Sequence, residues 1–438
     1  MANLHAIVLA ADPLSQVRIA GLSACERAVR VAKRIGAESV HVVDDDNSRA
    51  SLESWWTARS GKLLVIRANQ LVHTPLVDKL IASGGDAIAV VPDNPAVNDL
   101  TPGEFAGAFV VGGGAATDVV AALARGETDV AIVAKFSEPQ RVPHGAIARA
   151  PIATPDERRA ATRLLHRILI KPQDNAITRY AYRPVSMPLS KLLVWTPITP
   201  NQISYFVAMM VAFGCWLTAH ADFDLVLLGT VVVLLASYID CCDGEIARLK
   251  LLSSRYGAWV DTVVDELSSV GYMVALGWHC HLAFGPNYFG NLGFDPWLAA
   301  TAVGVVTYLW SIYCIYYNII VAVGSANSQD YVGRFEVVPG KQPNSMRLAP
   351  AATKVITTKE PLPQPLELIL TYLPYVVRRD FICWAAVAFA ALHATHAGFG
   401  TLVLGGLISF VILSIDHMKL RSLRRSVMRR GLLLEAPR

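Results

Sequence analysis

The sequence predicts a multidomain chain with an N-terminal α/β domain and a C-terminal all-α domain of six transmembrane helices. Of its 438 residues, 53% are hydrophobic and only 17% are charged, whereas soluble domains carry about 25% charged residues. Short apolar runs fill the first 150 residues, and apolar runs of membrane-spanning length begin near residue 203. This composition excludes a disordered chain and argues against an ordinary soluble enzyme. The formal net charge of +4 gives nucleic-acid binding little support.

Residues 1–150 alternate short apolar runs with helical or turn-rich segments. This alternation predicts a mostly parallel, Rossmann-like sheet covered by helices on both faces, and Gly112–Gly114 is predicted to form a turn. The N-terminus has no basic stretch before its apolar run and no cleavage pattern, so we expect this domain to stay in the cytoplasm. The predicted strands are Ala6–Ala10, Ser39–Val43, Leu63–Arg67, Ala87–Val91, Phe109–Val111 and Val130–Val133.

Residues 151–202 interleave basic side chains with Leu, Ile, Tyr and Trp. This pattern favours one or two amphipathic helices that lie along a membrane surface. A plain linker helix between two domains is the alternative. The basic residues concerned are Arg158, Arg159, Arg163, Arg167, Lys171, Arg179, Arg183 and Lys191.

Residues 203–438 contain six apolar runs of spanning length. Lys and Arg are absent from every second connection and frequent in the others, which places both termini in the cytoplasm. The third run carries Asp261, Asp265 and Glu266, which a lipid-facing helix would not tolerate cheaply. The predicted spans are about 203–220, 223–241, 257–283, 296–323, 377–394 and 399–416.

Four carboxylates mark the end of the second run and the start of the third. Asp240 and Asp243 are three residues apart, and Asp261 and Asp265 are four apart, so each pair shares one face of a helix. Four negative charges at membrane depth require cations. All-oxygen ligands favour Mg²⁺, Mn²⁺ or Ca²⁺ over zinc, and two such ions would leave a site for a diphosphate. An acidic cluster paired with loop arginines is the structural alternative.

Four further residues lie at spacings that fit the same pair of helical faces as these carboxylates. Gly244 and Ala247 extend the first face with almost no side chain, and Gly257 lies one turn before Asp261. Gly244 would let a large ligand approach the backbone. Arg248 offers a planar fork for a phosphate oxygen.

The complete pattern Asp-x2-Asp-Gly-x2-Ala-Arg-x8-Gly-x3-Asp-x3-Asp resembles the signature of the class-I CDP-alcohol phosphotransferases (CDP-alcohol phosphatidyltransferases). The segment Thr199-Pro200-Asn201 is similar to the one that leads into the family's first span, and the resemblance covers roughly residues 171–430. It implies a homodimeric six-span enzyme that moves a substituted phosphate from a CDP-linked alcohol to a second alcohol and releases CMP.

Carried over position by position, the resemblance assigns roles to the eight motif residues. Asp240, Asp243 and Asp261 would hold Mg²⁺ or Mn²⁺, with two ions in each site. Asp265 would complete the metal site and act as the catalytic base. The pocket for CDP would be lined by Asp243, Gly244, Ala247, Arg248 and Gly257.

The N-terminal domain resembles sugar-phosphate nucleotidyltransferases at Ala6–Ala11, Gly21-Leu22 and Glu26-Arg27. The whole chain is closest in architecture to di-myo-inositol phosphate phosphate synthase-like members, which are fused to such a domain. The turn that should wrap a triphosphate, 12–18, contains a proline and no glycine. Asn69 stands where the family places a metal-binding Asp. We therefore expect a domain that no longer makes CDP-alcohols and instead supports a dimer, binds a soluble ligand or docks a partner.

The acceptor pocket is expected near Arg378 and Arg379, at the start of the fifth span, and near Lys419 and Arg421, after the sixth. Fixed cations there would suit a phosphorylated acceptor such as inositol phosphate, although ordinary flanking charge explains them equally well. The donor could be CDP-diacylglycerol or a soluble CDP-inositol. A silent membrane scaffold and an ion-coupled transporter are the alternative functions, and the intact motif argues against the first. The transporter is disfavoured because the acidic helix pair is not repeated.

Overall fold

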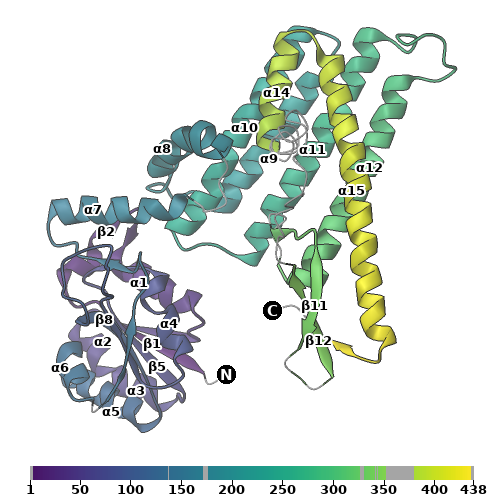
Figure 1. Ribbon diagram of the computed structural model, residues 1–438. Coiled ribbons are helices and arrows are strands. Elements are labelled where there is room, and N and C mark those ends of the chain that lie inside the picture. Colours follow the sequence, from purple (N-terminus) through teal and green to yellow (C-terminus); the bar gives the residue numbers. More distant parts are fainter. Residues whose placement is uncertain are drawn as a thin grey trace. The chain divides into compact units, whose positions relative to one another are not determined.

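A computed structural model describes residues 3–136, 138–170, 176–325, 330–340, 342, 344–351 and 379–435. The chain divides into two compact units. The N-terminal unit contains residues 1–174, 187–198 and 244–252, and the helical unit contains residues 175–186, 199–243 and 253–438. The predicted pairing of an α/β domain with a helical C-terminal part is confirmed, and each unit is described by itself (Figure 1).

The N-terminal unit is built on a six-stranded sheet with the order β4-β1-β5-β8-β7-β9. The sheet is mixed, because β8 runs antiparallel to both of its neighbours while the other three pairs are parallel. No helix separates β7 from β8, so the chain returns directly instead of crossing over. The strands are β1 (Leu4–Leu9), β4 (Ser39–Val43), β5 (Lys62–Arg67), β7 (Ala87–Val90), β8 (Phe105–Gly112) and β9 (Gln140–Pro143).

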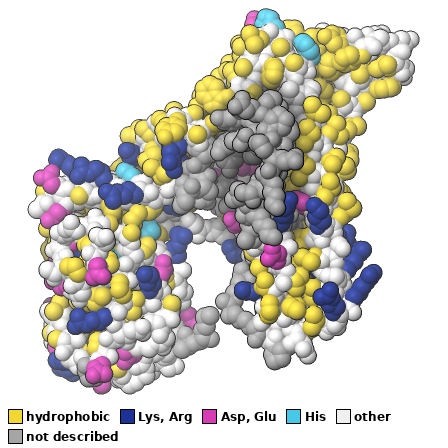
Figure 2. Space-filling view, viewed as in Figure 1, with side chains coloured by type: hydrophobic (Ala, Val, Ile, Leu, Met, Phe, Trp, Pro, Cys, Tyr) yellow, Lys and Arg dark blue, Asp and Glu magenta, His cyan; other side chains and the backbone are white. Residues whose placement is uncertain are grey.

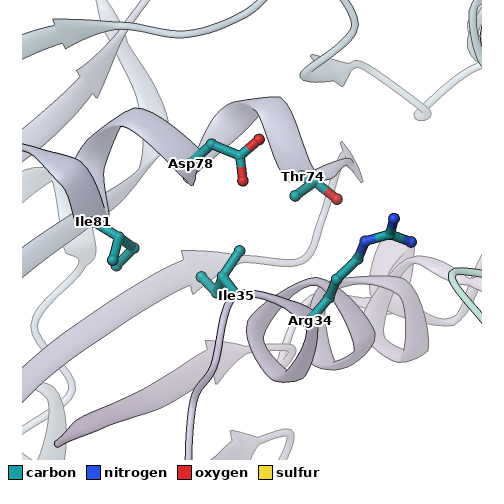
Figure 3. Close-up of a pocket in the computed structure, with 5 residues that line it drawn as sticks. All are labelled: Arg34, Ile35, Thr74, Asp78 and Ile81. Carbon is teal, nitrogen blue, oxygen red and sulfur yellow. The ribbon is translucent and has the colours of Figure 1, made fainter. Parts of the chain in front are cut away.

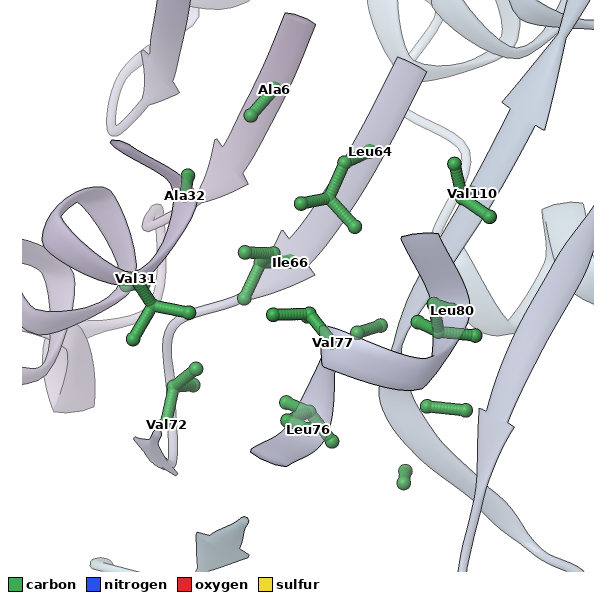
Figure 4. Packing of buried hydrophobic residues seen from close by; sticks show 14 of the residues in the cluster. Ala6, Val31, Ala32, Leu64, Ile66, Val72, Leu76, Val77, Leu80 and Val110 are labelled. Carbon is green, nitrogen blue, oxygen red and sulfur yellow. The ribbon is translucent and has the colours of Figure 1, made fainter. Parts of the chain in front are cut away.

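Alternate residues of the central strands feed two separate cores, one on each face of the sheet. Ala6, Leu64 and Val110 pack with Val31 and Leu80 on the first face (Figure 4). The intervening residues, such as Ile7 and Val65, join the core on the other face. This period of two is expected for strands buried on both sides.

Helices and short elements complete the unit. The α-helices are α1 (Ala24–Arg34), α2 (Asp46–Ala50), α3 (Leu52–Thr57), α4 (Asp78–Ala82), α5 (Gly113–Ala124), α6 (Asp129–Ala134), α7 (Pro155–His166) and α8 (Arg183–Leu193), whose first residues belong to the helical unit. Two small ladders join β2 (Arg18–Ile19) to β3 (Leu22–Ser23) and β6 (Leu71–Val72) to β10 (Arg149–Ala150). The predicted glycine turn is the junction at which β8 ends and α5 begins.

The predicted strand Val130–Val133 is wrong, because these residues lie in α6. Thr128 caps the helix by accepting a hydrogen bond from the backbone N–H of Ala131. Asp129, in the first turn, forms a salt bridge of 2.8 Å with Arg67 at the end of β5. A four-residue apolar run fits a strand or a helix equally well, and here the cap and the salt bridge decide.

The basic segment after residue 150 is helical, but the apolar face of α7 is not free to meet a membrane. Ala161, Leu164 and Leu165 are buried in a core with Ile19 and Leu71 of the N-terminal unit. The linker interpretation therefore fits α7 better than the surface-helix interpretation. In contrast, Leu192 on α8 and Trp195 just beyond it are largely exposed.

The N-terminal unit also contains the end of a long helix, α10 (Phe223–Leu249). Leu249 is fully buried in the core with α7, and Leu251 packs with the core beneath α1. Arg30 Nη1 donates to the carbonyl oxygen of Lys250 at 2.7 Å. Lys250 Nζ in turn donates to the carbonyl oxygens of Thr196 and Ile198.

The helical unit consists mainly of long apolar helices. Three of them are long and apolar enough to cross a membrane: α10, α12 with the π-helical turn that continues it, and α15. Hydrophobic side chains cover much of its described surface, and Lys and Arg gather near the C-terminal end of α15 (Figure 2). The helices are α9 (Pro200–Thr218), α10, α11 (Arg255–Phe284), α12 (Pro296–Asn318), α14 (Arg379–Ala391) and α15 (Thr395–Arg429).

Small residues bring these helices close together. A Cβ atom built on Gly229 of α10 would lie 2.5 Å from the carbonyl oxygen of Gly214 on α9. A Cβ atom on Gly277 of α11 would lie 1.9 Å from Thr301 Oγ1 on α12. Beyond α12 the chain forms β11 (Phe335–Pro339) and β12 (Ser345–Pro350), and β13 (Leu433–Leu434) pairs with β12.

Candidate active site

Three carboxylates meet where α10 and α11 face each other in the helical unit. Asp240 comes from α10, and Asp261 and Asp265 come from α11 one turn apart. One oxygen of each side chain lies within 4.8 Å of the other two, and all three residues are half-buried. Oxygen atoms at this spacing can share a divalent cation.

The fourth predicted ligand, Asp243, is not part of this three-residue group. Its side chain is buried, and Oδ2 accepts a hydrogen bond of 2.6 Å from Ser204 Oγ on α9. Ser204 also donates to the carbonyl oxygen of Pro200 in the first turn of α9. Ser204 was not predicted from the sequence, because a single serine in an apolar run has no periodic signal.

The small residues of the motif lie at close approaches. A Cβ atom built on Gly257 would lie 3.0 Å from Asn201 Oδ1, so any larger residue would press on the start of α9. A Cβ atom on Gly244 would lie 3.4 Å from Arg248 Nη1, which places the guanidinium over the glycine. Gly244, Ala247 and Arg248 all lie in the last two turns of α10, which belong to the N-terminal unit.

A third acidic residue on α11, Glu266, is held by tyrosines from α12. Glu266 Oε2 accepts a hydrogen bond of 2.8 Å from Tyr308 Oη, and Glu266 Oε1 accepts one of 3.4 Å from Tyr316 Oη. Tyr308 and Tyr316 are two helical turns apart and therefore share one face of α12. Because Glu266 follows Asp265, this clamp fixes the turn of α11 that carries the carboxylate cluster.

Comparison with known proteins identifies the part of the chain that carries this cluster. The family model of the CDP-alcohol phosphatidyltransferases matches residues 197–392. This part of the chain belongs to that family. The matched range holds all eight motif positions, together with Ser204, Glu266 and the two tyrosines that bind Glu266.

Curated relatives of the phosphatidyltransferase domain align with parts of this chain. A bifunctional IPC transferase and DIPP synthase from Aquifex aeolicus is 29% identical over 36% of this chain and 35% of its own length. The protein of the same name from Rubrobacter xylanophilus is 30% identical over 32% of this chain and 33% of its own. An archaetidylinositol phosphate synthase from Pyrococcus horikoshii is 30% identical over 20% of this chain and 47% of its own. The matches thus span a third to a half of these relatives.

Among solved structures, the apo form of Mycobacterium tuberculosis phosphatidylinositol phosphate synthase (PgsA1) covers 52% of this chain and 94% of its own. The sequence identity is 17% and the TM-score is 0.30, a likeness too loose to support an argument.

The predicted acceptor residues lie at the edges of the phosphatidyltransferase domain or beyond it. Arg378 is outside the described residues, and Arg379 is the first residue of α14. Lys419 and Arg421 are exposed on α15, and the Arg421 guanidinium carbon lies 5.9 Å from the centre of the Tyr317 ring. Arg424, which follows Arg421 by three residues, donates to Tyr317 Oη at 2.6 Å.

Proposed function

We propose that this protein is an integral-membrane CDP-alcohol phosphotransferase. It would transfer a substituted phosphate from a CDP-linked alcohol to an acceptor alcohol and release CMP. The observation that carries the proposal is the meeting of Asp240, Asp261 and Asp265 in a phosphatidyltransferase domain. Carboxylates gathered among apolar helices require cations, and the substrate of such a family carries a diphosphate that requires them too.

The donor set fits Mg²⁺ or Mn²⁺. The four aspartates of the motif offer only oxygen ligands, which these hard cations prefer. Asp240, Asp261 and Asp265 would hold the metal, and Asp243, kept in place by Ser204, would join them at a second ion. When bound, the ions would neutralise the negative charge of the diphosphate and of the departing CMP.

The protein's own groups would then bind and orient the two substrates. Asp265 accepts the proton of the acceptor hydroxyl as its oxygen bonds to the phosphorus, and the bond from that phosphorus to the CMP oxygen breaks. Gly244 and Ala247 leave room for the CDP backbone to approach α10, and Arg248 donates to a phosphate oxygen. Gly257 keeps α11 close to α9. Arg378, Arg379, Lys419 and Arg421 remain the proposed cations for the acceptor.

The proposed topology has six spans, with both termini and the active site on the cytoplasmic side. The three described helices that meet the criteria for a span support it, as do the apolar helices α9, α11 and α14 beside them. The boundaries at 1–150, 151–202 and 203–438 stay our proposal for a nucleotidyltransferase-like domain, juxtamembrane helices and the transferase domain, with α7 of the middle segment packed in the N-terminal unit. A homodimer remains part of the proposal through family resemblance.

The names of the relatives favour an inositol phosphate as the acceptor. Two of these proteins are named for IPC transfer and DIPP synthesis, and a third is named for archaetidylinositol phosphate synthesis. The donor would be a soluble CDP-inositol or a lipid such as CDP-diacylglycerol. The fused N-terminal unit favours the soluble donor, and the membrane domain suits either.

The test is CMP release by the full-length protein in lipid nanodiscs with Mg²⁺. CDP-diacylglycerol and CDP-inositol are each crossed with inositol, inositol phosphate and glycerol phosphate, with Asp265→Asn as the blank. Release from one pair would establish the reaction and identify the donor class. A parallel measurement of Mn²⁺ binding by electron paramagnetic resonance compares the wild type with Asp240→Ala, which should bind the ion more weakly. Silence without metal binding would favour a membrane scaffold instead.

A further inference from the structure

The connection between α11 and α12, residues 285–295, exposes large apolar side chains. It contains no Lys or Arg, and its only carboxylate, Asp295, accepts a hydrogen bond from Nδ1 of His281. Soluble proteins seldom expose several such side chains together, and a patch of this kind marks an interaction surface. Four side chains form the loop patch, each with 47–60% of its surface exposed: Tyr288, Phe289, Leu292 and Phe294.

The ends of this connection are fixed by contacts with both helices. Asp295 caps α12 by accepting a hydrogen bond of 2.9 Å from the backbone N–H of Trp297. The Trp297 indole N–H donates to the carbonyl oxygen of Gly285, the residue at which α11 ends. The rings of Tyr288 and Phe289 pack beside Trp297, with ring centres 5.4 and 5.2 Å away. The exposed side chains are therefore carried by a fixed part of the fold.

The length of α11 sets the depth of the loop patch in a membrane. Gly285 follows Asp265 by about 20 residues of continuous helix, which at 1.5 Å per residue corresponds to about 30 Å. The hydrocarbon core of a bilayer has the same thickness, about 30 Å. With the carboxylates at one face of the membrane, residues 285–295 lie at the level of the other. Irregular backbone is not exposed to lipid inside the hydrocarbon core, so this backbone belongs at the depth of the headgroups.

The loop patch continues the apolar surface of the helices that it joins. Leu282 in the last turn of α11 and Leu298 in the first turn of α12 are also exposed, and α12 is long and apolar enough to cross a membrane. Figure 1 shows the connection extending sideways from the ends of the two helices, and Figure 2 shows hydrophobic side chains over the same corner. A segment with this course would run along the membrane surface.

Apolar side chains at the surface of the N-terminal unit lie among charged groups instead. Ile35 and Ile81 line a pocket of about 410 Å³ together with Arg34 and Asp78 (Figure 3). Residues 285–295 offer their apolar side chains no such charged neighbours within the segment. This difference favours lipid over water as the surroundings of the loop patch.

We propose that residues 285–295 insert the loop patch into the membrane–water interface at the end of the helical unit opposite the carboxylate cluster. Its partner is the glycerol and upper acyl region of the bilayer, where aromatic rings with a polar edge are favoured. The exposed amides of Asn287 and Asn291 would stay among the hydrated headgroups. This anchor would fix the depth of α11 and thereby that of Asp261 and Asp265. The assignment rests on the proposed membrane topology and not on the transferase reaction.

The test is fluorine NMR of the full-length protein in lipid nanodiscs, with trifluoromethyl-phenylalanine placed at one position at a time. Labels at Phe289 and Phe294 report on the loop patch. Phe213, an exposed ring on α9, is the reference for contact with lipid, and Phe136, after α6, is the reference in the N-terminal unit. A nitroxide on the upper acyl chain should broaden the two patch signals about threefold more than a soluble gadolinium chelate does, as expected for side chains at the interface. The order of the two reagents should be reversed at Phe136.

A double variant tests whether the apolar side chains themselves hold the connection in the interface. With the label at Phe294, Phe289→Ser combined with Leu292→Ser should reduce the effect of the lipid nitroxide about twofold, because two of the apolar side chains are lost. Asn287→Ser, at an exposed polar position of the same connection, is the matched control and should leave the effect unchanged. The labels in the otherwise unaltered protein decide the question if the double variant fails to fold.

Two results would overturn the assignment. Stronger broadening of both patch signals by the soluble chelate would mean that the connection faces water. Protection of both signals from both reagents would mean that protein covers the loop patch, as in an interface with a second copy. A normal response of Phe213 to the lipid nitroxide would confine either failure to this connection, whereas its loss would remove the proposed topology as well. CMP release remains a separate test of the reaction.

Discussion

The two units bury opposite charges. The helical unit gathers Asp240, Asp261 and Asp265, whose neighbouring oxygens could share a cation. The N-terminal unit instead buries the positive charge of Arg27, whose Nε and Nη1 atoms have no hydrogen-bond partner among the described residues, and it places His73 near Arg27 and Arg34. A buried charge of either sign costs free energy unless it is paired or hydrogen-bonded. The comparison shows that the N-terminal unit, which carries none of the motif carboxylates, still buries polar groups that the described residues do not hydrogen-bond.

The largest effect should follow the loss of one negative charge in the helical unit. Asp265→Asn keeps the side-chain shape but removes the proposed base, so CMP release should fall roughly 10²–10⁴-fold while the protein stays folded. Asp224→Asn, an exposed aspartate in the first turn of α10, is the matched control. Turnover at the wild-type rate in Asp265→Asn would remove Asp265 from the role of base.

A smaller effect, on folding stability, should appear when the pH falls and His73 becomes protonated. The unfolded chain binds a proton at His73 as the pH falls through about 6.5, but the folded chain does so only near the pKa of about 4 to which burial, Arg27 and Arg34 lower it. Folding stability is therefore lost as the pH falls across this window, by roughly 3 kcal/mol in total. His73→Phe should flatten the dependence, as measured by hydrogen exchange of β1 and α1 from pH 7 to 4.5. An unchanged slope would mean that His73 is not the titrating group.

A third change tests the contact between α1 and the end of α10. Arg30→Gln removes a charged donor from the carbonyl oxygen of Lys250, which should destabilise this part of the N-terminal unit by about 2 kcal/mol. Faster hydrogen exchange across 244–252 would report the loss. Arg30→Lys is the conservative control and should recover part of the protection. Equal exchange in all three proteins would show that this hydrogen bond contributes nothing.

The smallest effect is expected at the turn 12–18 of the N-terminal unit. Asn69 Nδ2 donates to Asp12 Oδ2 at 3.1 Å, so the two residues now satisfy each other. Asn69→Ala should leave CMP release within about twofold of the wild type, since removal of one half-buried hydrogen bond is worth about 1 kcal/mol of local stability. A complete loss of transfer would reveal a role for this turn in the reaction.

The carboxylate cluster could be predicted from the sequence because its geometry is local. Spacings of three and four residues place Asp240 with Asp243, and Asp261 with Asp265, on shared helical faces whatever the tertiary structure. The hydrogen bond that Ser204 gives Asp243 depends on how α9 packs, so no spacing rule could reveal it. The same is true of the tyrosines that bind Glu266.

The proximity of Arg27 and His73 could not be predicted from the sequence, because it depends on contacts between distant segments. Arg27 reads as an ordinary charged position on an amphipathic helix, and His73 follows a two-residue strand that carries almost no periodic signal. Only the packing of β6 against α1 brings them together. The error at α6 has a related cause, because a cap at Thr128 and a salt bridge from Arg67 overrode the strand preference of a short apolar run.

The path of α10 has a practical consequence for work on the isolated transferase domain. This continuous helix carries Asp240 and Asp243 and then ends inside the N-terminal unit, where Leu249 is fully buried. A truncated fragment that began at residue 151 would remove the core that packs with Leu251 and part of the core that buries Leu249, and it would delete Arg30. The last turns of the helix would then fray. Low activity in such a fragment would then reflect damage to the helix that carries Asp240 and Asp243. It would not show that the N-terminal unit contributes an enzymatic activity of its own.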